Sequence, residues 1–280
     1  MSTSSNPVVV IGAGLAGALA ATLLARRGHQ VAVFERRGDL RKSTGSAGRS
    51  INLALSTRGI AALSRVGLEA DVLATTLPMY GRRMHDTDGT MTYQPYGQDG
   101  QAIRSVSRRG LNEALLNLAA AEPGVTLHFN QRCAKVDLEA GVTTFISSTG
   151  EESVIQSSLI VGSDGVFSAV RDQMMRRGRF DYEQMYLAHG YKELTIPPTE
   201  TGGFRIASDA LHIWPRGDFM LIALPNNDGS FTLTLFQAFE GEMGLNALDA
   251  DPARVQTFFE RCFPDVLPHM PTLHADWAAN

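Results

Sequence analysis

The most constraining feature of the sequence is a set of glycines directly after a short apolar segment. The stretch "VVVIGAGLAGALAATLLARRG" begins at Val8 with apolar residues, turns at Gly12, and continues with apolar residues at helical spacing until Gly28, a natural helix stop. Residues 31–35, "VAVFE", form a second, nearly continuous apolar stretch. A strand, a helix and a second buried strand are typical of a crossover unit in a parallel sheet covered on both faces. We therefore predict an α/β fold.

The glycines follow the pattern G-x-G-x-x-G at the junction of strand and helix. Gly12 permits a tight turn, Gly14 lets backbone N–H groups approach a pyrophosphate, and Gly17 completes the pattern at the positive end of the helix. Glu35 ends the second strand, where a carboxylate can accept hydrogen bonds from a ribose. The alternative is a structural glycine turn beside a solvated glutamate. Strand, helix and acid together favour a dinucleotide site, without deciding between NAD and FAD.

The rest of the chain changes its pattern at about residue 180. Before it, apolar residues at helical spacing from Leu111 to Leu118 precede a predicted strand at 125–129, which suggests a further crossover. The Gly-, Ser- and charge-rich segment 36–50 is predicted to be a loop. After residue 180, alternating segments at 210–214, 219–225 and 231–237 predict an antiparallel sheet, with Gly217-Asp218 in a hairpin turn. A final helix follows, with Asp251 as N-cap and Pro252 at its first position.

Composition and charge argue against several classes of function. A chain of 280 residues with net charge −4 has no global attraction for phosphate backbones, so nucleic acid is not expected as the main partner. The polar start lacks the pattern of a secretory signal, and no apolar run is long enough to span a membrane, so we expect a cytoplasmic location. Cys133 and Cys262 show no metal spacing and are expected to be small buried hydrophobes; no metal site is predicted.

A second motif favours FAD. The segment "LIVGSDGVFSAVR", residues 159–171, places Asp164-Gly165 directly after an apolar strand and before a helix start. Ligands of such sheets bind at the carboxyl ends of the strands. An ordinary Asp-Gly turn is the alternative. Together with the glycine pattern, the segment resembles the Asp-Gly motif of the flavin-dependent aromatic hydroxylases, whose aspartate reaches the ribityl and pyrophosphate region of FAD.

Longer segments resemble the kynurenine-hydroxylating branch of that family. They cover nearly the whole chain and are "GRSINLAL", "SVSRRGLN", "HGYKELTIPP", "LHIWPRGDFMLIALPN" and "FTLTLF". The resemblance implies an enzyme in which NADPH reduces FAD, the flavin reacts with O2 to a C4a-hydroperoxide, and L-kynurenine becomes 3-hydroxykynurenine. It also implies a role in tryptophan degradation and quinolinate/NAD biosynthesis. Activation of oxygen is carried out by the flavin, so no catalytic side chain is assigned. The oligomeric state is left open.

The resemblance also implies a domain organisation. We expect a Rossmann-like FAD-binding domain with a parallel sheet in residues 1–75 and 104–178. An antiparallel β-sheet substrate domain is expected in residues 76–103 and 179–280. The family continues with a Gly-Asp-Ala-Ala-His segment and further helices, whereas this sequence ends at "HADWAAN". We therefore expect the C-terminal part of the family fold to be missing, with a part of the flavin and substrate contacts.

Several residues are expected to bind FAD. Arg108 stands in the first turn of a predicted helix, where a cation is disfavoured unless an anion such as pyrophosphate lies nearby. The resemblance adds Arg49, facing phosphate, and the backbone near Ala54. The full predicted set is Gly12, Gly14, Ala16, Gly17, Glu35, Arg36, Arg49, Ala54, Arg108, Cys133, Asp164, Gly165 and Ala169.

The predicted substrate residues combine a cation with an apolar wall. L-Kynurenine carries a carboxylate and an aromatic ketone, so its site needs a planar cation and an apolar slot. The resemblance places the carboxylate-binding arginine on Arg83 in "PMYGRRMHD" and its tyrosine partner on Tyr96 in "QPYG". The expected wall consists of Leu211, Met220, Ile222, Leu224 and Phe236. A face packed in the protein core would show the same period-two pattern.

Three other functions remain open at this point. A flavin hydroxylase of another aromatic acid would share the two motifs but need not share "GRSINLAL" or "LHIWPR". A non-catalytic, truncated flavin-binding fragment would explain the early end of the sequence. An NAD-dependent dehydrogenase is disfavoured by the Asp-Gly motif.

Overall fold

The computed structural model describes residues 6–42 and 52–280. The chain divides into a first unit, residues 1–49, 65–68 and 109–184, and a second unit, residues 50–64, 69–108 and 185–280. Most elements of the first unit are β1 (Val8–Ile11), α1 (Leu15–Ala25), β2 (Val31–Phe34), the 3-10 turn η1 (Leu40–Lys42), α4 (Arg108–Ala121), β8 (Val125–His128), β9 (Gln131–Asp137), β10 (Val142–Ser147), β11 (Glu152–Gln156), β12 (Leu159–Gly162) and α5 (Ala169–Met175).

The second unit contains more strands than the first. Its elements are β3 (Asn52–Leu55), α2 (Thr57–Ser64), α3 (Glu69–Ala74), β4 (Leu77–Met79), β5 (Gly81–His85), β6 (Met91–Pro95), β7 (Ile103–Ser107), β13 (His189–Ile196), β14 (Ala210–Arg216), β15 (Phe219–Pro225), β16 (Phe231–Ala238), α6 (Leu245–Asp249), α7 (Pro252–Cys262), η2 (Leu267–His269) and α8 (Leu273–Ala278).

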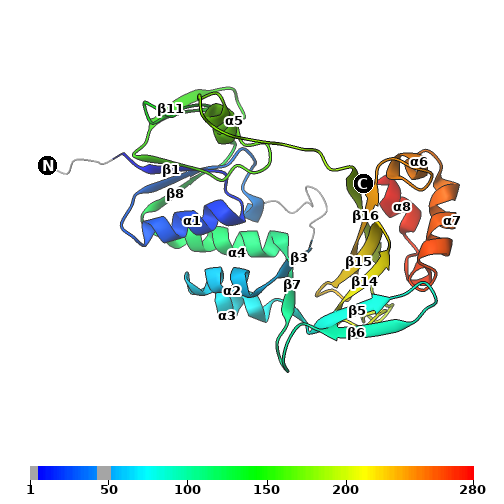
Figure 1. Cartoon of the computed structure of the whole chain (residues 1–280). Helices are drawn as coiled ribbons and strands as arrows, with labels where there is room; N and C mark the ends of the chain where they lie inside the picture. The colour runs from blue at the N-terminus through cyan, green and yellow to red at the C-terminus, as the bar shows by residue number, and fades with distance from the viewer. Residues whose placement is uncertain (1–5, 43–51) are drawn as a thin grey trace. The chain divides into compact units, whose positions relative to one another are not determined.

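The first unit contains the predicted parallel sheet. Its strands lie in the order β12-β1-β2-β8, and every neighbouring pair is parallel. Helix α1 covers one face (Figure 1). On the other face, side chains of β1 and β2 pack with the antiparallel strands β9 to β11 and with α5. The ring of Phe34 stacks on that of Phe145 at 3.8 Å between centroids, so the sheet is buried on both faces as its apolar strands predict.

The second unit contains a six-stranded sheet in the order β13-β16-β15-β14-β5-β6. Two of its neighbouring pairs, β14–β15 and β15–β16, join the segments predicted to alternate, and both are antiparallel, as is the pair of β13 with β16. The predicted antiparallel pairing of these segments is confirmed, and the sheet contains in addition one parallel pair, β14 with β5. No hairpin joins these two strands, which lie more than a hundred residues apart in the sequence, so no tight turn imposes the antiparallel direction.

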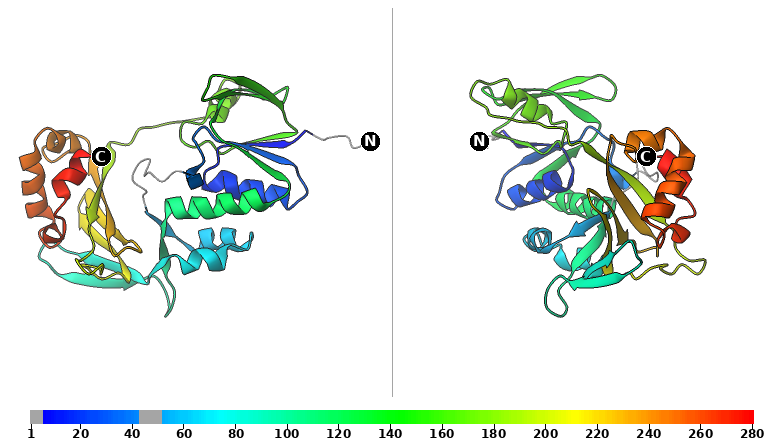
Figure 2. Two further views of the ribbon diagram at one scale, coloured as in Figure 1. Left: turned by 180° about the vertical axis from the view of Figure 1, so that it is seen from behind. Right: turned by 45° about the vertical axis from the view of Figure 1, so that its right-hand side comes forward.

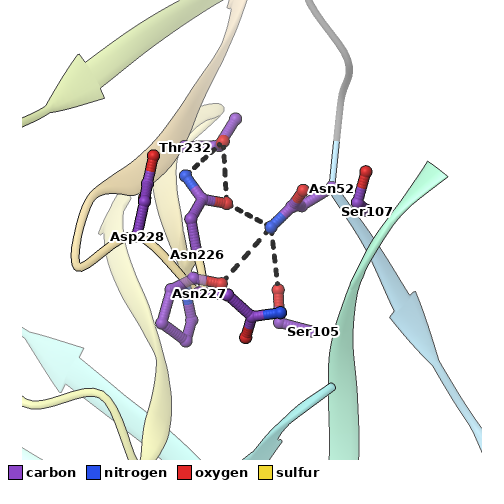
Figure 3. A pocket seen from close by; sticks show the side chains of 8 residues that line it. Asn52, Ser105, Ser107, Asn226, Asn227, Asp228 and Thr232 are labelled. Atoms are coloured by element: carbon purple, nitrogen blue, oxygen red, sulfur yellow. Dashed lines mark hydrogen bonds between the residues drawn. The ribbon is translucent and has the colours of Figure 1, made fainter. Parts of the chain in front are cut away.

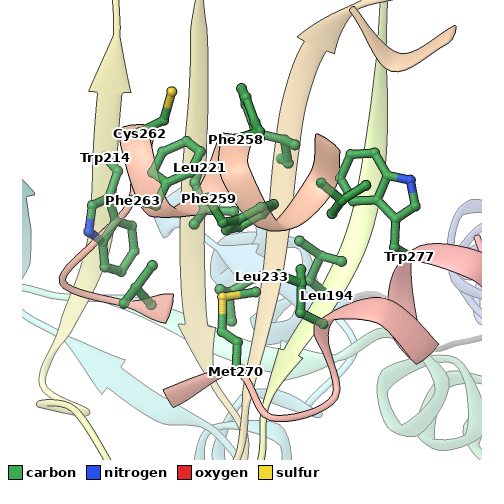
Figure 4. Packing of buried hydrophobic residues seen from close by; sticks show 14 of the residues in the cluster. Leu194, Trp214, Leu221, Leu233, Phe258, Phe259, Cys262, Phe263, Met270 and Trp277 are labelled. Atoms are coloured by element: carbon green, nitrogen blue, oxygen red, sulfur yellow. The ribbon is translucent and has the colours of Figure 1, made fainter. Parts of the chain in front are cut away.

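One face of the six-stranded sheet is covered by the C-terminal helices. Leu221 of β15 and Leu233 of β16 pack with Phe259 of α7 and Trp277 of α8 in a continuous buried cluster (Figure 4). Figure 2 shows α7 and α8 on the same side of this sheet. Because side chains alternate along a strand, the neighbours of these core residues point to the opposite face.

Local predictions are confirmed where turn and cap chemistry is specific. Gly28 follows α1 with φ +88°, and Gly217 has φ +73° in the turn between β14 and β15. Asp251 caps α7, its carboxylate accepting a hydrogen bond from the backbone N–H of Ala253 at 2.9 Å, with Pro252 first in the helix. The predicted loop at 36–50 contains one 3-10 turn, η1, within its described part.

The packing of residues 50–108 differs from the expected domain boundaries. Residues 50–64, 69–75 and 104–108, expected in the FAD-binding domain, pack with the second unit. The reason is strand pairing: β3 pairs with β7, and β7 pairs with β4, in a separate three-stranded sheet. Residues that pack in one unit can still contact a ligand bound to the other. The predicted FAD-binding and substrate-binding domains therefore stay a prediction.

Candidate functional site

The parallel sheet brings the two predicted cofactor motifs together. Ile11 at the end of β1 pairs with Phe34 of β2 and with Gly162 of β12. The residues that follow these strands therefore meet at one edge of the sheet. They are Gly12, Glu35 and the Ser163-Asp164 pair, which lie far apart in the sequence. This is the carboxyl edge at which such sheets bind ligands.

The three glycines of the first motif have different structural roles. Gly12 has φ +99°, and a Cβ there would lie 2.7 Å from the backbone carbonyl carbon of Ser163. A Cβ on Gly17 would collide with the carbonyl oxygen of Gly12 and approach Ser163 Oγ at 2.6 Å. Ser163 Oγ donates to the carbonyl oxygens of Ile11 and Gly12, at 2.8 Å in each case. Gly12 and Gly17 are thus required by close packing between the two motifs.

Gly14 is different because it borders open space. Among the described residues, no atom of another element lies within 4 Å of the place a Cβ would take. Gly14 is the N-cap of α1, no side chain caps the helix, and its first turn carries no acidic residue. Ala16 in that turn is exposed. Free N–H groups at a helix N-terminus attract phosphate, so these residues fit the pyrophosphate of FAD.

Glu35 is held in place by backbone and side-chain donors. Its Oε2 accepts a hydrogen bond from the N–H of Ala13, and its Oε1 accepts from the N–H and Nε of Arg37, all at 3.0 Å. Burial raises the pKa of Glu35, but these hydrogen bonds outweigh it and hold the pKa below its ordinary value. The carboxylate is ionised at neutral pH, and Oε2 keeps a lone pair for a ribose hydroxyl.

Arg37 was missed by the sequence reasoning. Arg36, which the resemblance selected, is exposed and directly follows Glu35, whereas its neighbour Arg37 makes the ion pair with the carboxylate. In "FERRGD" the two arginines are indistinguishable by composition. The sequence feature that could have identified Arg37 is its position two residues after Glu35, directly after the end of the predicted strand.

Asp164 is engaged by the helix that follows it. Its Oδ1 accepts from Ser168 Oγ at 2.6 Å, and its Oδ2 accepts from the N–H of Ala169 at 2.7 Å. The predicted contact Ala169 is therefore placed by Asp164 itself. Gly165 has φ +83° and is exposed with open space around its Cα, which leaves a close approach to the backbone free.

Cys133 of β9 lies in the same region. Burial and then the nearby charge of Asp164 raise the pKa of the Cys133 thiol to about 11. The thiol is protonated at neutral pH and is neither a nucleophile nor a metal ligand. The structure brings Cys133 close to Asp164, as the prediction of a common cofactor site requires.

The remaining predicted cofactor residues are not in this cluster. Arg49 lies outside the described residues. Ala54 and Arg108 belong to the second unit. Arg108 is the exposed first residue of α4, and Ala54 is exposed in β3, where it pairs with Ser105. Their role in binding FAD stays a prediction.

The second unit has a polar pocket of about 320 Å3 beside β3 (Figure 3). Asn52 of β3 donates from Nδ2 to Asn226 Oδ1 in a short hydrogen bond and to Ser105 Oγ at 3.1 Å. Asn226 donates in turn to Thr232 Oγ1 of β16 at 3.1 Å. The amide pair connects the strand that carries Ala54 with the hairpin β15–β16. The sequence reasoning missed both asparagines, because they meet only in the tertiary structure.

The predicted apolar wall lies on the face of the six-stranded sheet that the helices leave uncovered. Register pairs Met220 with Phe236, and the alternation along β15 places Ile222 and Leu224 on the same face. The core residues Leu221 and Leu233 point the other way. Met220 is 40% exposed, while Leu224 is buried. These residues do not belong to the buried cluster that Leu221 and Leu233 form with the helices, and their contact with a substrate stays a prediction.

Leu211 belongs to the same face and has a charged neighbour. It pairs in register with Arg82 of β5, and Arg82 carries its guanidinium carbon 5.2 Å from the centre of the Tyr96 ring. Arg82 and Tyr96 are therefore on the face of the apolar wall. A planar cation, an aromatic ring and apolar side chains are found together there.

The predicted pairing of Arg83 with Tyr96 does not occur in the structure. Arg83 pairs with Tyr93 and His212 on the opposite face, its guanidinium carbon 5.6 Å from the ring centre of Tyr93. Its terminal nitrogen lies 3.2 Å from Asp209 Oδ1. The physical reason is the alternation of side chains along β5, which sends two adjacent arginines to opposite faces. Arg82 was missed because the strand register of "GRRMH" is not visible in the sequence.

Comparison with known proteins supports the cofactor site. A family model described as FAD binding domain matches residues 5–189. The chain is 48% identical over 276 residues to kynurenine 3-monooxygenase of Salinispora arenicola, covering 98% of this chain and 61% of that protein. It is 44% identical to kynurenine 3-monooxygenase of Anopheles gambiae, covering 93% of this chain and 53% of that protein. The chain thus spans less than two thirds of the length of the curated relatives it matches.

Solved structures confirm the fold class. The structure of 2-methyl-3-hydroxypyridine-5-carboxylic acid oxygenase superposes with a TM-score of 0.73 at 23% identity, covering 99% of this chain and 68% of that one. That of p-nitrophenol 4-monooxygenase PnpA from Pseudomonas putida gives 0.73 at 15% identity, covering 96% and 65%. At these identities the similarity shows the fold alone. Among the helices of the described residues, none has the length and apolarity that a bilayer crossing requires.

Proposed function

This chain belongs to the FAD binding domain family, and from that premise we propose that it acts in the NADPH-dependent hydroxylation of L-kynurenine to 3-hydroxykynurenine. The observation that carries the proposal is the 48% identity to a kynurenine 3-monooxygenase over 98% of the chain. Tryptophan degradation, quinolinate/NAD biosynthesis and a cytoplasmic location belong to the same proposal.

Different residues of the site would bind different parts of FAD. The N-terminus of α1 at Gly14 would receive the pyrophosphate, and Glu35 would accept a hydrogen bond from the ribose. Gly165 would allow the backbone after Asp164 to approach the ribityl region. When bound and reduced by NADPH, FAD supplies the activated oxygen from O2.

The chain's own contribution at the substrate would be binding, orientation and exclusion of water. Arg82 is the cation suited to the substrate carboxylate, because it shares a face with Tyr96 and Leu211. The wall of Met220, Ile222, Leu224 and Phe236 would hold the aromatic ring. A side chain that transfers a proton is not required, since a positioned substrate and a dry site suffice for oxygen transfer from a reactive cofactor.

The experiment uses the 280-residue chain reconstituted with FAD. Visible absorption measures bound flavin, and NADPH oxidation is followed with and without L-kynurenine, with product identified by mass spectrometry. We expect bound FAD, faster NADPH oxidation with L-kynurenine, and 3-hydroxykynurenine. Stimulation by a phenolic or pyridine carboxylic acid instead would assign a different aromatic hydroxylase. Bound FAD without product would leave a flavin-binding function alone, and absence of FAD would overturn the cofactor assignment.

A further inference from the structure

A chain of hydrogen bonds runs through two buried histidines of the second unit. His85 Nδ1 lies 2.8 Å from Asp265 Oδ2, and His85 Nε2 lies 2.8 Å from His212 Nδ1. His212 Nε2 lies 2.7 Å from the carbonyl oxygen of Ala207. Both rings are nearly inaccessible, with 5% and 2% of their surface exposed. The chain lies on the helix-covered face of the sheet, opposite Arg82, and the proposed function does not use it.

The number of hydrogen atoms that these hydrogen bonds require determines the charge of the two histidines. Each of the three hydrogen bonds needs one hydrogen, and neither the carbonyl of Ala207 nor an ionised Asp265 has one to give. Three N–H hydrogens must therefore be on the two imidazoles. Two neutral imidazoles have only two N–H groups between them. The pair thus has one hydrogen more than two neutral rings.

We propose that His85 and His212 together hold one extra proton, and hence one positive charge, that fixes strand β5 on strand β14. The pair is a positioning element, because it lies on the face of the sheet opposite Arg82 and the proposed substrate wall. Leu211 pairs with Arg82 and His212 pairs with Arg83 along the same two strands. The bond between the rings therefore acts at the place where Arg82 is held beside the apolar wall.

The surroundings of the pair supply an aromatic face and an opposite charge. The ring of Trp214 stacks on His85 at 4.1 Å between centroids, and its Nε1 donates to the same Asp265 Oδ2 at 2.8 Å. An aromatic face and a carboxylate both stabilise an imidazolium. Burial raises the pKa of Asp265, but the hydrogen bonds from His85 and Trp214 outweigh it and hold the pKa below its ordinary value. The carboxylate therefore stays ionised and supplies the opposite charge.

His212 is the less suitable place for the charge. The pKa of His212 is lowered to about 4, mainly by burial; the charges of His85 and Arg83 act in the same direction, and the hydrogen bond to the Ala207 carbonyl acts against them. Asp209 partly compensates the charge of Arg83. The side chain of Arg216 donates from Nη1 to the backbone carbonyl oxygen of His85 at 2.9 Å. Asp265 is the carboxylate that contacts His85 directly, whereas the ring of His212 is bonded to His85 and to the carbonyl of Ala207.

Loss of the extra proton would interrupt the series of hydrogen bonds through the two histidines. Two neutral rings cannot make all three hydrogen bonds, so one buried nitrogen would be left facing a lone pair. An unsatisfied buried polar group is costly, and the contact between β5 and β14 would loosen. We therefore expect all three hydrogen bonds to be present while the extra proton is bound, and one of them to be lost when this proton leaves as the pH is raised.

The direct test is nuclear magnetic resonance of the 280-residue chain labelled with 15N-histidine, with no substitution. At pH 7 we expect three protonated ring nitrogens for His85 and His212 together, assigned with His85→Gln and His212→Gln. Two protonated nitrogens would overturn the proposal. Because no flavin or kynurenine is needed, failure of the proposed function would leave this result unaffected.

Tryptophan fluorescence gives a second readout with a matched control. An imidazolium stacked on Trp214 quenches its emission, so emission is expected to rise as the extra proton is lost on raising the pH. Asp265→Asn removes the countercharge and is expected to abolish this pH dependence. Asp249→Asn is the control, because Asp249 accepts from the other tryptophan, Trp277, at 2.8 Å and pairs with Lys192. An unchanged profile in Asp265→Asn, with the fold checked by circular dichroism, would contradict the proposal; if that variant does not fold, the spectrum of the unsubstituted chain decides.

Discussion

At the residue scale, one glycine motif contains glycines kept for different reasons. Gly12 combines φ +99° with a backbone contact that a Cβ would violate, so it serves the fold. Gly14 has an ordinary φ of −72° and faces open space, so it serves the approach of a ligand. Both positions are glycine in the sequence pattern, so the pattern alone does not distinguish close packing at Gly12 from open space at Gly14.

Substitution of each glycine by alanine should separate stability from flavin binding. Gly12→Ala is expected to lower the free energy of unfolding by about 2 kcal/mol or more, because the new Cβ meets the backbone at Ser163 in a strained conformation. Gly14→Ala is expected to cost less than about 1 kcal/mol and to weaken FAD binding. Urea unfolding and flavin titration measure the two effects. Equal losses of stability in both variants would contradict this division.

At the element scale, the strand β5 determines which arginine shares a face with the apolar wall. Adjacent residues of a strand point to opposite faces, so Arg82 and Arg83 have different surroundings despite being neighbours. Arg82 stands over Tyr96, whereas Arg83 lies beside Asp209 and Tyr93. The register of the sheet thus gives two chemically identical side chains different surroundings.

Paired variants test this assignment. Arg82→Ala is expected to weaken L-kynurenine binding to the FAD-loaded chain by about tenfold or more, the effect of losing a charged hydrogen bond. Arg83→Ala, which disrupts a largely exposed ion pair, should change binding less than about threefold. Isothermal titration measures both, and thermal unfolding serves as the control for folding. A larger loss in Arg83→Ala would return the carboxylate to Arg83.

At the scale of the whole molecule, the buried histidines connect stability to pH. The pKa of His212 is lowered from 6.5 to about 4, mainly by burial. Between these values the unfolded chain binds more protons at this position than the folded chain does. The free energy of unfolding therefore rises with pH across this window and falls as the pH is lowered through it.

The expected size of this effect can be measured by denaturant unfolding at several pH values. The contribution of His212 lost between pH 6.5 and about 4 is at most about 3 kcal/mol. His212→Gln should flatten the dependence in this window. His274→Gln, at an exposed position, is the matched control and should leave it unchanged. A slope that persists in His212→Gln would place the acid sensitivity elsewhere.

Much of the fold and of the cofactor site could be predicted because both depend on local sequence. Apolar strands at 8–11 and 31–34, a glycine turn and the Asp164-Gly165 pair each follow from a few adjacent residues. The carboxyl edge of a parallel sheet then brings them together by a general rule. The cap at Asp251 and the turn at Gly217 were predicted for the same reason.

By itself, the sequence thus determined the α/β class, the family and the position of the cofactor motifs. Only the tertiary structure decided which arginine accompanies Tyr96, that Arg37 holds Glu35, and that Asn52 meets Asn226. It also decided that β14 pairs in parallel with β5 and that two distant histidines share a hydrogen-bond chain. The physical reason is that strand register and long-range pairing are set by packing of whole elements, to which no single segment of sequence gives access.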